Sequence, residues 1–309
     1  MNNIAEKINK LRKEKNAVIL AHNYVPGDVQ DIADFAGDSL GLSKQAAETD
    51  ADLIVFCGVH FMAETASILS PEKTVLIPDR TAGCPMADMI TAEQLKAFKE
   101  EHPQALVVCY VNSTAEVKAL SDYCCTSGNA VELVKALPAD KEIIFVPDKN
   151  LGAFVRERTG RNIILWPGYC PTHVVITLDK LQTVKSQHPD AVVLAHPECP
   201  PATWPEADFL LSTGQMLGHA EQSEAKKFII ATEPGIIHAL KKRCPDKEFI
   251  EACETICPNM KKLTLEKLLW SLERDEYEVK VEKEVAQKAS RALMRMLEVL
   301  PATSTRKSN

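Results

Sequence analysis

The stretch AVILAHNY at residues 17–24 decides the fold, because it recurs twice at a nearly constant interval. Its counterparts are ALVVCYVN at 105–112 and AVVLAHPE at 191–198. Each copy is an apolar run that ends in a polar triplet. His22, Tyr110 and His196 hold the same place in the three copies, at offsets of 88 and 86 residues. This period predicts three repeated units.

Other landmarks follow the same period. Hydroxyl-bearing turns (GDSLG, TSGNA and STGQM) come next, and two further apolar runs complete each unit, at 53–58, 142–147 and 227–232, and at 74–79, 162–167 and 248–252. The runs alternate with helical stretches such as 91–103 and 177–189. Continuous apolar strands that alternate with helices favour parallel sheets covered on both faces. We therefore expect an α/β fold of three repeated αβα sandwich domains, with parallel sheets around a pseudo-threefold axis.

The helix expected before the first strand of each unit sets the domain boundaries. They fall at 1–87, 88–174 and 175–309, and the third domain carries a C-terminal helical extension at 283–299. The final PATSTRKSN is expected to fray.

Composition restricts the class of protein and its partners. The net charge of −7 and a pI near 5.7 argue against a nucleic-acid partner, which a basic face would indicate. No apolar stretch approaches the roughly 20 residues of a membrane span. The polar N-terminal helix lacks the apolar core of a signal peptide. We expect a cytoplasmic protein, in which ten cysteines indicate metal binding or catalysis rather than disulfides.

Three Cys-Pro pairs share the interval of the repeat. Cys84, Cys170 and Cys257 lie 86 and 87 residues apart, each after an apolar run. Ligands of parallel sheets collect beyond the carboxyl ends of the strands, so these thiols are expected to converge. No C-x2-C pair, the usual mark of structural zinc, is present. Three separate thiolates favour a [4Fe–4S] cluster whose fourth iron is an open Lewis acid. The alternative is three buried core thiols.

The polar triplets and hydroxyl turns are expected to line the same cavity. Histidine, tyrosine and carboxylate side chains transfer protons, and helix N-termini bind carboxylates and phosphates. The pattern favours a site for a small polyanion. The alternatives are ordinary strand-end polar groups and N-caps. The residues concerned are His22, Tyr24, Ser39, Tyr110, Asn112, Ser127, His196, Glu198, Ser212 and Thr213.

Two further features are expected to be structural. The acidic run from Asp28 to Asp38 suits the positive end of a helix. Gly214 and Gly218 indicate turns or close packing.

Several motifs together resemble the quinolinate synthase family from about residue 17 to 300. They are ILAHNY, DIADFAGDSL, GVHFMAET, PDRTAGCPMAD, YVNST, CTSGNA, HPECP, STGQM and CPNMKK. The resemblance implies three αβα domains and a [4Fe–4S] cluster held by Cys84, Cys170 and Cys257. It also implies the condensation of iminoaspartate with dihydroxyacetone phosphate to quinolinate, phosphate and water, in de novo NAD biosynthesis. L-aspartate oxidase is the implied candidate for a transient partner.

Carried over by position, the resemblance also assigns roles to site residues. Glu198 matches the base and Tyr24 the proton donor, while His22 and His173 match further catalytic positions; His173 lies in the loop Cys-Pro-Thr-His. Matching substrate-binding positions are His22, Ser39, Tyr110, Asn112, Ser127, His196, Glu198, Ser212 and Thr213. Some family members carry a C-terminal C-x2-C-x2-C segment. It is missing here, which puts any redox regulation tied to it in doubt.

Two other functions compete with this interpretation. One is a non-catalytic iron–sulfur electron carrier or sensor, which has no need of a pocket rich in His, Tyr, Glu and Ser. The other is a zinc hydrolase that uses His22, His196 and Glu198, although no short ligand spacing supports it.

Overall fold

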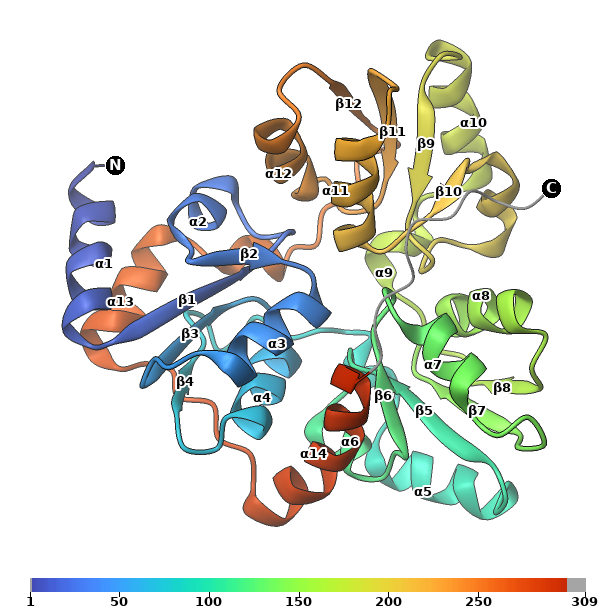
Figure 1. The fold of residues 1–309 in the computed structure, drawn as a ribbon, viewed down its shortest axis with the longest axis horizontal. Helices are drawn as coiled ribbons and strands as arrows, with labels where there is room; N and C mark the ends of the chain where they lie inside the picture. Colours follow the sequence, from blue (N-terminus) through green and yellow to red (C-terminus); the bar gives the residue numbers. More distant parts are fainter. Residues whose placement is uncertain (1, 299–309) are drawn as a thin grey trace.

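Each of the three units is built around one four-stranded parallel sheet, and the three sheets have equivalent strand orders. The computed structural model describes residues 2–298 (Figure 1). The first sheet has the order β2-β1-β3-β4, and the second and third repeat it as β6-β5-β7-β8 and β10-β9-β11-β12. This confirms the predicted α/β class and its three repeated parallel sheets. The strands are β1 (Ala17–His22), β2 (Phe35–Gly37), β3 (Leu53–Cys57), β4 (Thr74–Leu76), β5 (Leu106–Tyr110), β6 (Tyr123–Cys125), β7 (Ile143–Val146), β8 (Ile163–Leu165), β9 (Val192–Ala195), β10 (Phe209–Leu210), β11 (Lys227–Ala231) and β12 (Glu248–Glu251).

Helices follow the strands and cover both faces of the sheets (Figure 1). The predicted stretches 91–103 and 177–189 form α5 and α10. The α-helices are α1 (Asn2–Glu14), α2 (Gly27–Ile32), α3 (Ser39–Glu48), α4 (His60–Leu69), α5 (Ala92–Glu101), α6 (Ala115–Ala119), α7 (Ala130–Ala136), α8 (Lys149–Thr159), α9 (Pro171–Val174), α10 (Leu178–Gln187), α11 (Thr213–Gln222), α12 (Ile236–Arg243), α13 (Leu265–Arg274) and α14 (Lys283–Glu298). Short 3₁₀ turns lie at Ala87–Met89, Pro201–Glu206 and Met260–Lys262.

An aspartate fixes the start of the central strand in each sheet in the same way. Its carboxylate accepts a strand N–H at 2.8 Å, and its own N–H donates to the carbonyl of the same strand residue. The three pairs are Asp34 with Ile19, Asp122 with Val107, and Asp208 with Val193. The carboxylates are 88 and 86 residues apart, so the hydrogen bonds follow the period of the sequence.

A basic side chain covers the carboxyl end of a helix in each unit, again at offsets of 88 and 86 residues. Lys73 donates to carbonyls of residues 49 and 51 after α3, and Lys247 donates to those of residues 220 and 223 at the end of α11. Arg161 donates to four carbonyls between residues 134 and 141, around the end of α7. Helix ends leave carbonyls without partners, and these cations satisfy them.

The aspartates of the acidic run each bind a different partner. Asp31 accepts from Lys242 at 2.7 Å and from His238 at 2.9 Å, and these bonds lower the pKa of its carboxyl. Asp34 fixes β1, as described above. Asp38 is the N-cap of α3 and accepts the N–H of Gly41 at 2.9 Å. Asp31 and Asp34 therefore have structural partners but, contrary to the prediction, do not lie at the start of a helix, whereas Asp38 caps α3 and also lines the cavity described below.

The C-terminal segment packs on the first two units rather than on the third. Helix α13 contacts α1 and β3, and α14 contacts α6, β6 and α4 (Figure 1). Between them, Tyr277 exchanges backbone hydrogen bonds with Ile77, and the N–H of Val279 donates to the carbonyl of Val75. This pairing is antiparallel and extends the edge of the first sheet. The boundaries at residues 87 and 174 stay predictions, and PATSTRKSN lies outside the described residues.

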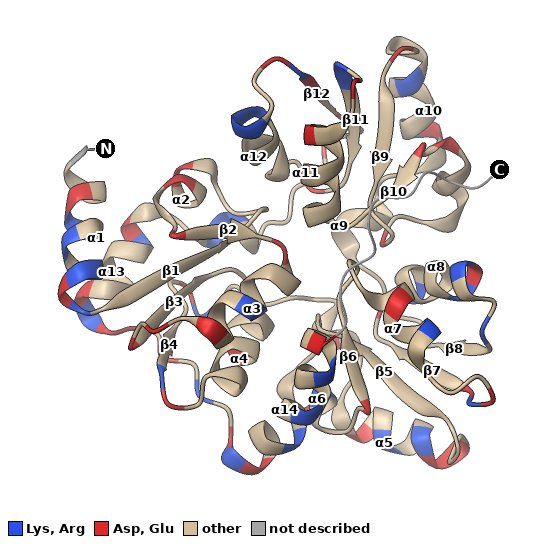
Figure 2. Ribbon diagram, viewed as in Figure 1, with Lys and Arg blue, Asp and Glu red and all other residues tan. Residues whose placement is uncertain are grey.

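Charged residues lie mainly in the outer helices and loops, with both signs mixed, and few of them lie in the strands (Figure 2). Within residues 2–298, none of the helices is both long and apolar enough to cross a membrane.

Candidate active site

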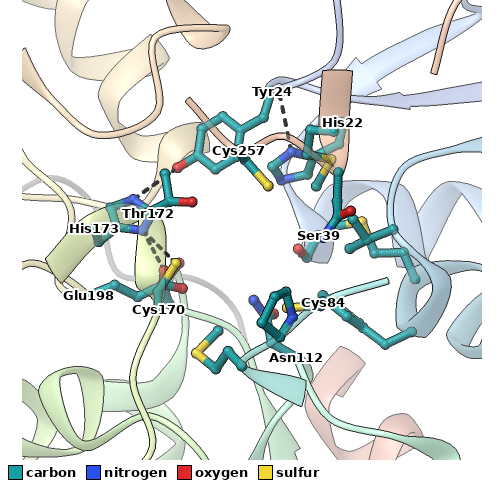
Figure 3. Close-up of a pocket in the computed structure, with 18 of the residues that line it drawn as sticks. His22, Tyr24, Ser39, Cys84, Asn112, Cys170, Thr172, His173, Glu198 and Cys257 are labelled. Atoms are coloured by element: carbon teal, nitrogen blue, oxygen red, sulfur yellow. Dashed lines mark hydrogen bonds and ion pairs between the residues drawn. The ribbon is translucent and has the colours of Figure 1, made fainter. Parts of the chain in front are cut away.

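A cavity of about 160 Å³ lies where the carboxyl ends of the three sheets meet. Figure 3 shows its side chains approaching from different units of the fold. Ser212 is absent from the lining. Its hydroxyl accepts the N–H of Gln215 at 3.3 Å and caps α11. The other predicted residues all contribute to the lining: His22, Tyr24, Ser39, Cys84, Tyr110, Asn112, Ser127, Cys170, His173, His196, Glu198, Thr213 and Cys257.

The three cysteines that share the interval of the repeat, Cys84, Cys170 and Cys257, reach the cavity from three sides (Figure 3). Cys84 follows β4, Cys257 follows β12, and Cys170 is the N-cap of α9, with Pro171 as the first helical residue. All three residues are partly buried. Burial raises the pKa of the Cys84 thiol to about 12 and also raises the pKa of the other two thiols. They stay protonated near neutral pH unless a metal displaces the proton.

His22 and His196 are held as neutral donors by the same backbone contact. In each, Nδ1 accepts the N–H of the residue two positions on, at 3.2 Å from Tyr24 and 3.3 Å from Glu198. Burial lowers the pKa of both imidazoles to about 3. The proton of the neutral ring therefore lies on Nε2. The Nε2 of His196 lies 3.1 Å from the Ser127 hydroxyl, so this donor faces the hydroxyl group of the second unit.

A continuous hydrogen-bond network joins Tyr24 to Tyr110 across the site. Tyr24 Oη lies 2.5 Å from Thr232 Oγ1, which lies 2.7 Å from His173 Nε2. His173 Nδ1 lies 2.7 Å from one oxygen of Glu198, and the Tyr110 hydroxyl donates to the other at 2.5 Å. The five residues come from all three units, so the network closes only when the units are assembled.

The network shifts the pKa of its carboxyl group and those of its tyrosines in opposite directions. Burial opposes ionisation of Glu198, but the adjacent His173 and the hydrogen bonds to it hold the pKa of this carboxyl well below its ordinary value. Burial and the charge of Glu198 raise the pKa of Tyr24 and Tyr110 well above 10. Near neutral pH the site therefore holds Glu198 as a carboxylate and the two tyrosines in their protonated form.

Thr232 is a member of this network that the sequence analysis did not identify. It directly follows β11, where the other two units have Gly58 and Pro147. Reasoning from repeated landmarks could not find it, because its hydroxyl occurs in one unit only.

The sequence pattern also did not indicate three ionisable side chains behind the cavity lining, those of Glu233, Lys261 and Asp148. Glu233 accepts the N–H of Cys257 at 3.3 Å and pairs with Lys261 at 2.8 Å. Lys261 also donates to the carbonyl of Tyr24 at 2.5 Å. The buried Asp148 accepts the N–H groups of residues 150 and 151, and burial raises the pKa of its carboxyl well above 3.8. Glu233 therefore holds the backbone of the Cys257 loop, and Asp148 caps α8.

The N-termini of α3 and α11 approach each other at the cavity. Ser39 and Thr213 are their first residues. A Cβ placed on Gly214 would lie 2.5 Å from Asp38 Oδ2, whereas one placed on Gly218 meets nothing within 4 Å. Gly214 therefore permits close packing between units, as predicted, and Gly218 does not have that role. Two helix N-termini with hydroxyls favour anionic groups.

The structure also tests the alternative metal sites. Among residues 2–298, a set of three donors within 4.8 Å of one another consists of Cys170, His173 and Glu198. This group could hold a metal ion, although hydrogen bonds already use both ring nitrogens of His173. His22 and His196 do not belong to that set, and both use Nδ1 to accept a backbone N–H. The ligand set of the zinc hydrolase hypothesis, His22, His196 and Glu198, is therefore not among the donor groups found in the described part of the chain.

Comparisons with known proteins identify the family of the chain. The family model "Quinolinate synthetase A protein" matches residues 6–298. A quinolinate synthase of Dehalococcoides mccartyi (strain CBDB1) is 55% identical over 298 residues, 96% of this chain and 98% of the relative. "Quinolinate synthase 2" of Methanosarcina acetivorans is 54% identical over 297 residues, covering 96% of both chains. The quinolinate synthase of Geobacter metallireducens is also 54% identical over 297 residues, 96% of this chain and 97% of the relative. The chain belongs to the quinolinate synthetase A family.

Proposed function

We propose that this protein is a quinolinate synthase of de novo NAD biosynthesis. It joins iminoaspartate to dihydroxyacetone phosphate at a [4Fe–4S] cluster held by Cys84, Cys170 and Cys257. The observation that carries the proposal is the meeting of three thiols, one from each unit, in the pocket that also holds the acid–base network. Family membership over nearly the whole chain supports it.

The spacing of the thiols fits a cluster better than a single ion. Two thiolates on one tetrahedral zinc lie about 3.8 Å apart, given a Zn–S bond of about 2.3 Å. In the described residues, Cys84, Cys170 and Cys257 do not form a set of donors within 4.8 Å of one another. Thiols farther apart suit a cluster in which each iron takes one of them. When bound, such a cluster supplies an iron without a protein ligand, which is a Lewis acid for a substrate oxygen.

The other residues of the pocket bind and orient the anionic substrates. The Nε2–H groups of His22 and His196 donate hydrogen bonds without adding positive charge. Ser39 and Thr213 place hydroxyls at the N-termini of two helices, a setting that favours carboxylate and phosphate groups. The amide oxygen of Asn112 is buried without a hydrogen-bond partner in the described structure, so it is free to accept from a substrate N–H or O–H.

Proton transfer belongs to Glu198 and Tyr24. Glu198 is ionised and Tyr24 keeps its proton, which are the states that a proton acceptor and a proton donor require. His173 holds Glu198, and Thr232 holds Tyr24 to His173. A non-catalytic electron carrier does not require such a network. A cytoplasmic location suits the ten free thiols, and L-aspartate oxidase as a transient partner stays a prediction.

Anaerobic reconstitution tests the cluster. We expect brown protein with about four irons per chain and an electron paramagnetic resonance signal after reduction. Cys170→Ser should lose the cluster and quinolinate formation. Cys253→Ser is the matched control, because Cys253 lies four residues before Cys257 but outside the cavity lining. Stoichiometric zinc without iron, or full iron content in Cys170→Ser, would refute the assignment.

Glu198→Gln tests the chemistry separately from the cluster. The variant should keep its iron, because Glu198 is not one of the proposed ligands, and should lose quinolinate and phosphate release by at least about a hundredfold. Near-normal product formation would remove Glu198 from the acid–base role.

A further inference from the structure

A second cavity, of about 150 Å³, lies against α13, apart from the cysteine pocket. Lys267, Trp270, Ser271 and Arg274 line it from one face of the helix, since they are spaced three, four and seven residues from the first. The other wall is the loop 78–81 together with residues 276 and 277. We propose that this cavity is an effector site that binds a small planar aromatic carboxylate.

The charges of the lining suit a carboxylate. Arg80 and Arg274 form no ion pair with a carboxylate anywhere in residues 2–298; each guanidinium carbon instead lies over a ring, 5.4 Å from Tyr277 and 5.8 Å from Trp270. A guanidinium can bind a carboxylate through two parallel hydrogen bonds. Three cations and two carboxylates line the cavity, which leaves an excess of one positive charge: Lys267, Arg80 and Arg274 against Asp79 and Glu276.

Asp79 does not compete for the two arginines. Its carboxylate accepts from Lys267 at 2.6 Å and from the Thr81 hydroxyl at 2.7 Å. Both guanidinium groups therefore remain available to a ligand.

The shape and the aromatic surface of the cavity suit a single ring. Trp270 is 52% exposed and Tyr277 is 39% exposed, so both present ring surface to solvent. Planar ligands stack on such surfaces. A cavity of about 150 Å³ is known to hold one benzene molecule. Ser271 is 2% exposed, and its hydroxyl oxygen has no hydrogen-bond partner among the described residues, so it can bond to a ligand.

Inorganic phosphate is a poorer match for this cavity. The lining from α13 runs from Lys267 to Arg274, the last helical residue. A helix presents carbonyls at this end, and the N–H groups that bind phosphate lie at the other.

The cavity is connected to two of the cysteine loops. The chain runs from Arg80 in the cavity wall to Cys84 over four residues. Lys262, five residues after Cys257, donates to the carbonyl of Thr81 at 2.7 Å. A ligand held by Arg80 therefore contacts the segment that sets the position of two thiols. If the ligand binds one conformation of this segment better than another, it shifts the positions of the two thiols and thereby the surroundings of the cluster.

The proposed product belongs to the same chemical class, since quinolinate is a planar pyridine dicarboxylate. The cavity at α13 would then bind quinolinate at a second position, apart from the pocket where it forms. The identification of quinolinate as the ligand rests on the proposed function.

The test is calorimetric titration of the anaerobic holoenzyme with phthalate, a planar benzene dicarboxylate. We expect two binding events, because the cysteine pocket, whose proposed product is also a planar aromatic dicarboxylate, can take phthalate as well. The double variant Arg80→Gln/Arg274→Gln should weaken only one of them, at least about tenfold, because two charge-assisted hydrogen-bond donors are lost. Arg158→Gln is the matched control. Its guanidinium carbon also lies 5.4 Å from a ring centroid, that of Phe154, but outside the cavity.

A single binding event in the wild type, or affinities that the double variant leaves unchanged, overturns the site. Equal affinity for inorganic phosphate, or for the non-planar cyclohexane-1,2-dicarboxylate, overturns the aromatic class. The effector role is read from the electron paramagnetic resonance signal of the reduced cluster, at a phthalate concentration that fills the cavity in the wild type but not in the double variant. The signals of the two proteins should then differ. Identical signals in the wild type and the double variant overturn that role. Iron content and quinolinate formation, measured on the same samples without phthalate, report the proposed function separately.

Discussion

At the scale of single residues, environment rather than residue type sets the chemistry of the pocket. Glu198 and Tyr24 belong to one network, yet the pKa of the first is lowered and that of the second is raised. The repeat in the sequence located both residues. It could not give their protonation states, because these depend on burial and on partners from other units. His173 and Thr232 are such partners, and each lies in one unit only.

Thr232 should position the acid–base pair without taking part in cluster binding. Thr232→Val removes the hydroxyl that joins Tyr24 to His173 at nearly constant volume. We expect kcat to fall about 10- to 100-fold, because a buried network loses a member, while the iron content stays unchanged. Thr232→Ser should restore most of the rate. If Thr232→Val and Thr232→Ser behave alike, the hydroxyl has no such role.

The buried histidines should make stability depend on pH. The folded pKa of His22 and His196 is about 3, against 6.5 for a free histidine. The unfolded chain therefore binds protons that the folded chain does not, and the stabilisation present above pH 6.5 is lost as the pH falls toward 3. Each histidine should contribute a slope of up to about 1.4 kcal/mol per pH unit in this range.

The measurement is the apparent Tm of cluster-free protein between about pH 5 and 6.5, where few ordinary carboxyl groups titrate. His22→Asn and His196→Asn should each flatten the decline, and His102→Asn, outside the pocket, should leave it unchanged. Equal slopes in all four proteins would contradict the assignment.

At the scale of helices and strands, the repeat consists of recurring contacts as well as recurring residues. Long apolar runs predicted three strands of each sheet correctly. The fourth strands, β2, β6 and β10, have only three, three and two residues. Segments this short carry no periodic signal, so their pairing beside the central strand is visible only in three dimensions. The aspartates that precede them carry the period of 88 and 86 residues and were the available signal.

The cations at the helix ends should stabilise the units to different extents. Arg161 donates to four carbonyls, whereas Lys73 and Lys247 each donate to two. Arg161→Met should cost about 1–3 kcal/mol, because carbonyls lose charged donors. Lys247→Met should cost less. Apparent Tm values under one set of conditions give the order, and a smaller loss for Arg161→Met than for Lys247→Met would contradict it.

At the scale of the whole molecule, the site exists only where the three units meet. Each unit contributes one proposed cluster ligand, and the network from Tyr24 to Tyr110 crosses the boundaries between units. The equal spacing of landmarks predicted this convergence correctly. The destination of the C-terminal segment was not predictable from it, because α13 and α14 lie outside the repeat and pack on the first and second units.

Two glycines of one helix test the contact between units. Gly214→Ala places a Cβ 2.5 Å from Asp38 Oδ2, which should push the N-termini of α3 and α11 apart and raise KM for the anionic substrate several-fold. Gly218→Ala meets nothing within 4 Å. It should preserve KM and stabilise the protein by about 0.5–1 kcal/mol through helix propensity. Similar KM values in both variants would show that close packing at Gly214 does not shape the site.

The pairing of Tyr277–Val279 with the edge of the first sheet has a consequence for synthesis on the ribosome. The first sheet is complete only when a segment some 200 residues further along the chain has emerged. Until then the nascent first unit lacks both its outer edge and the helix α13 that packs on α1. Translation therefore delivers the first unit early and completes it late. A truncated chain that ends before α13 leaves this edge open to pairing with other chains.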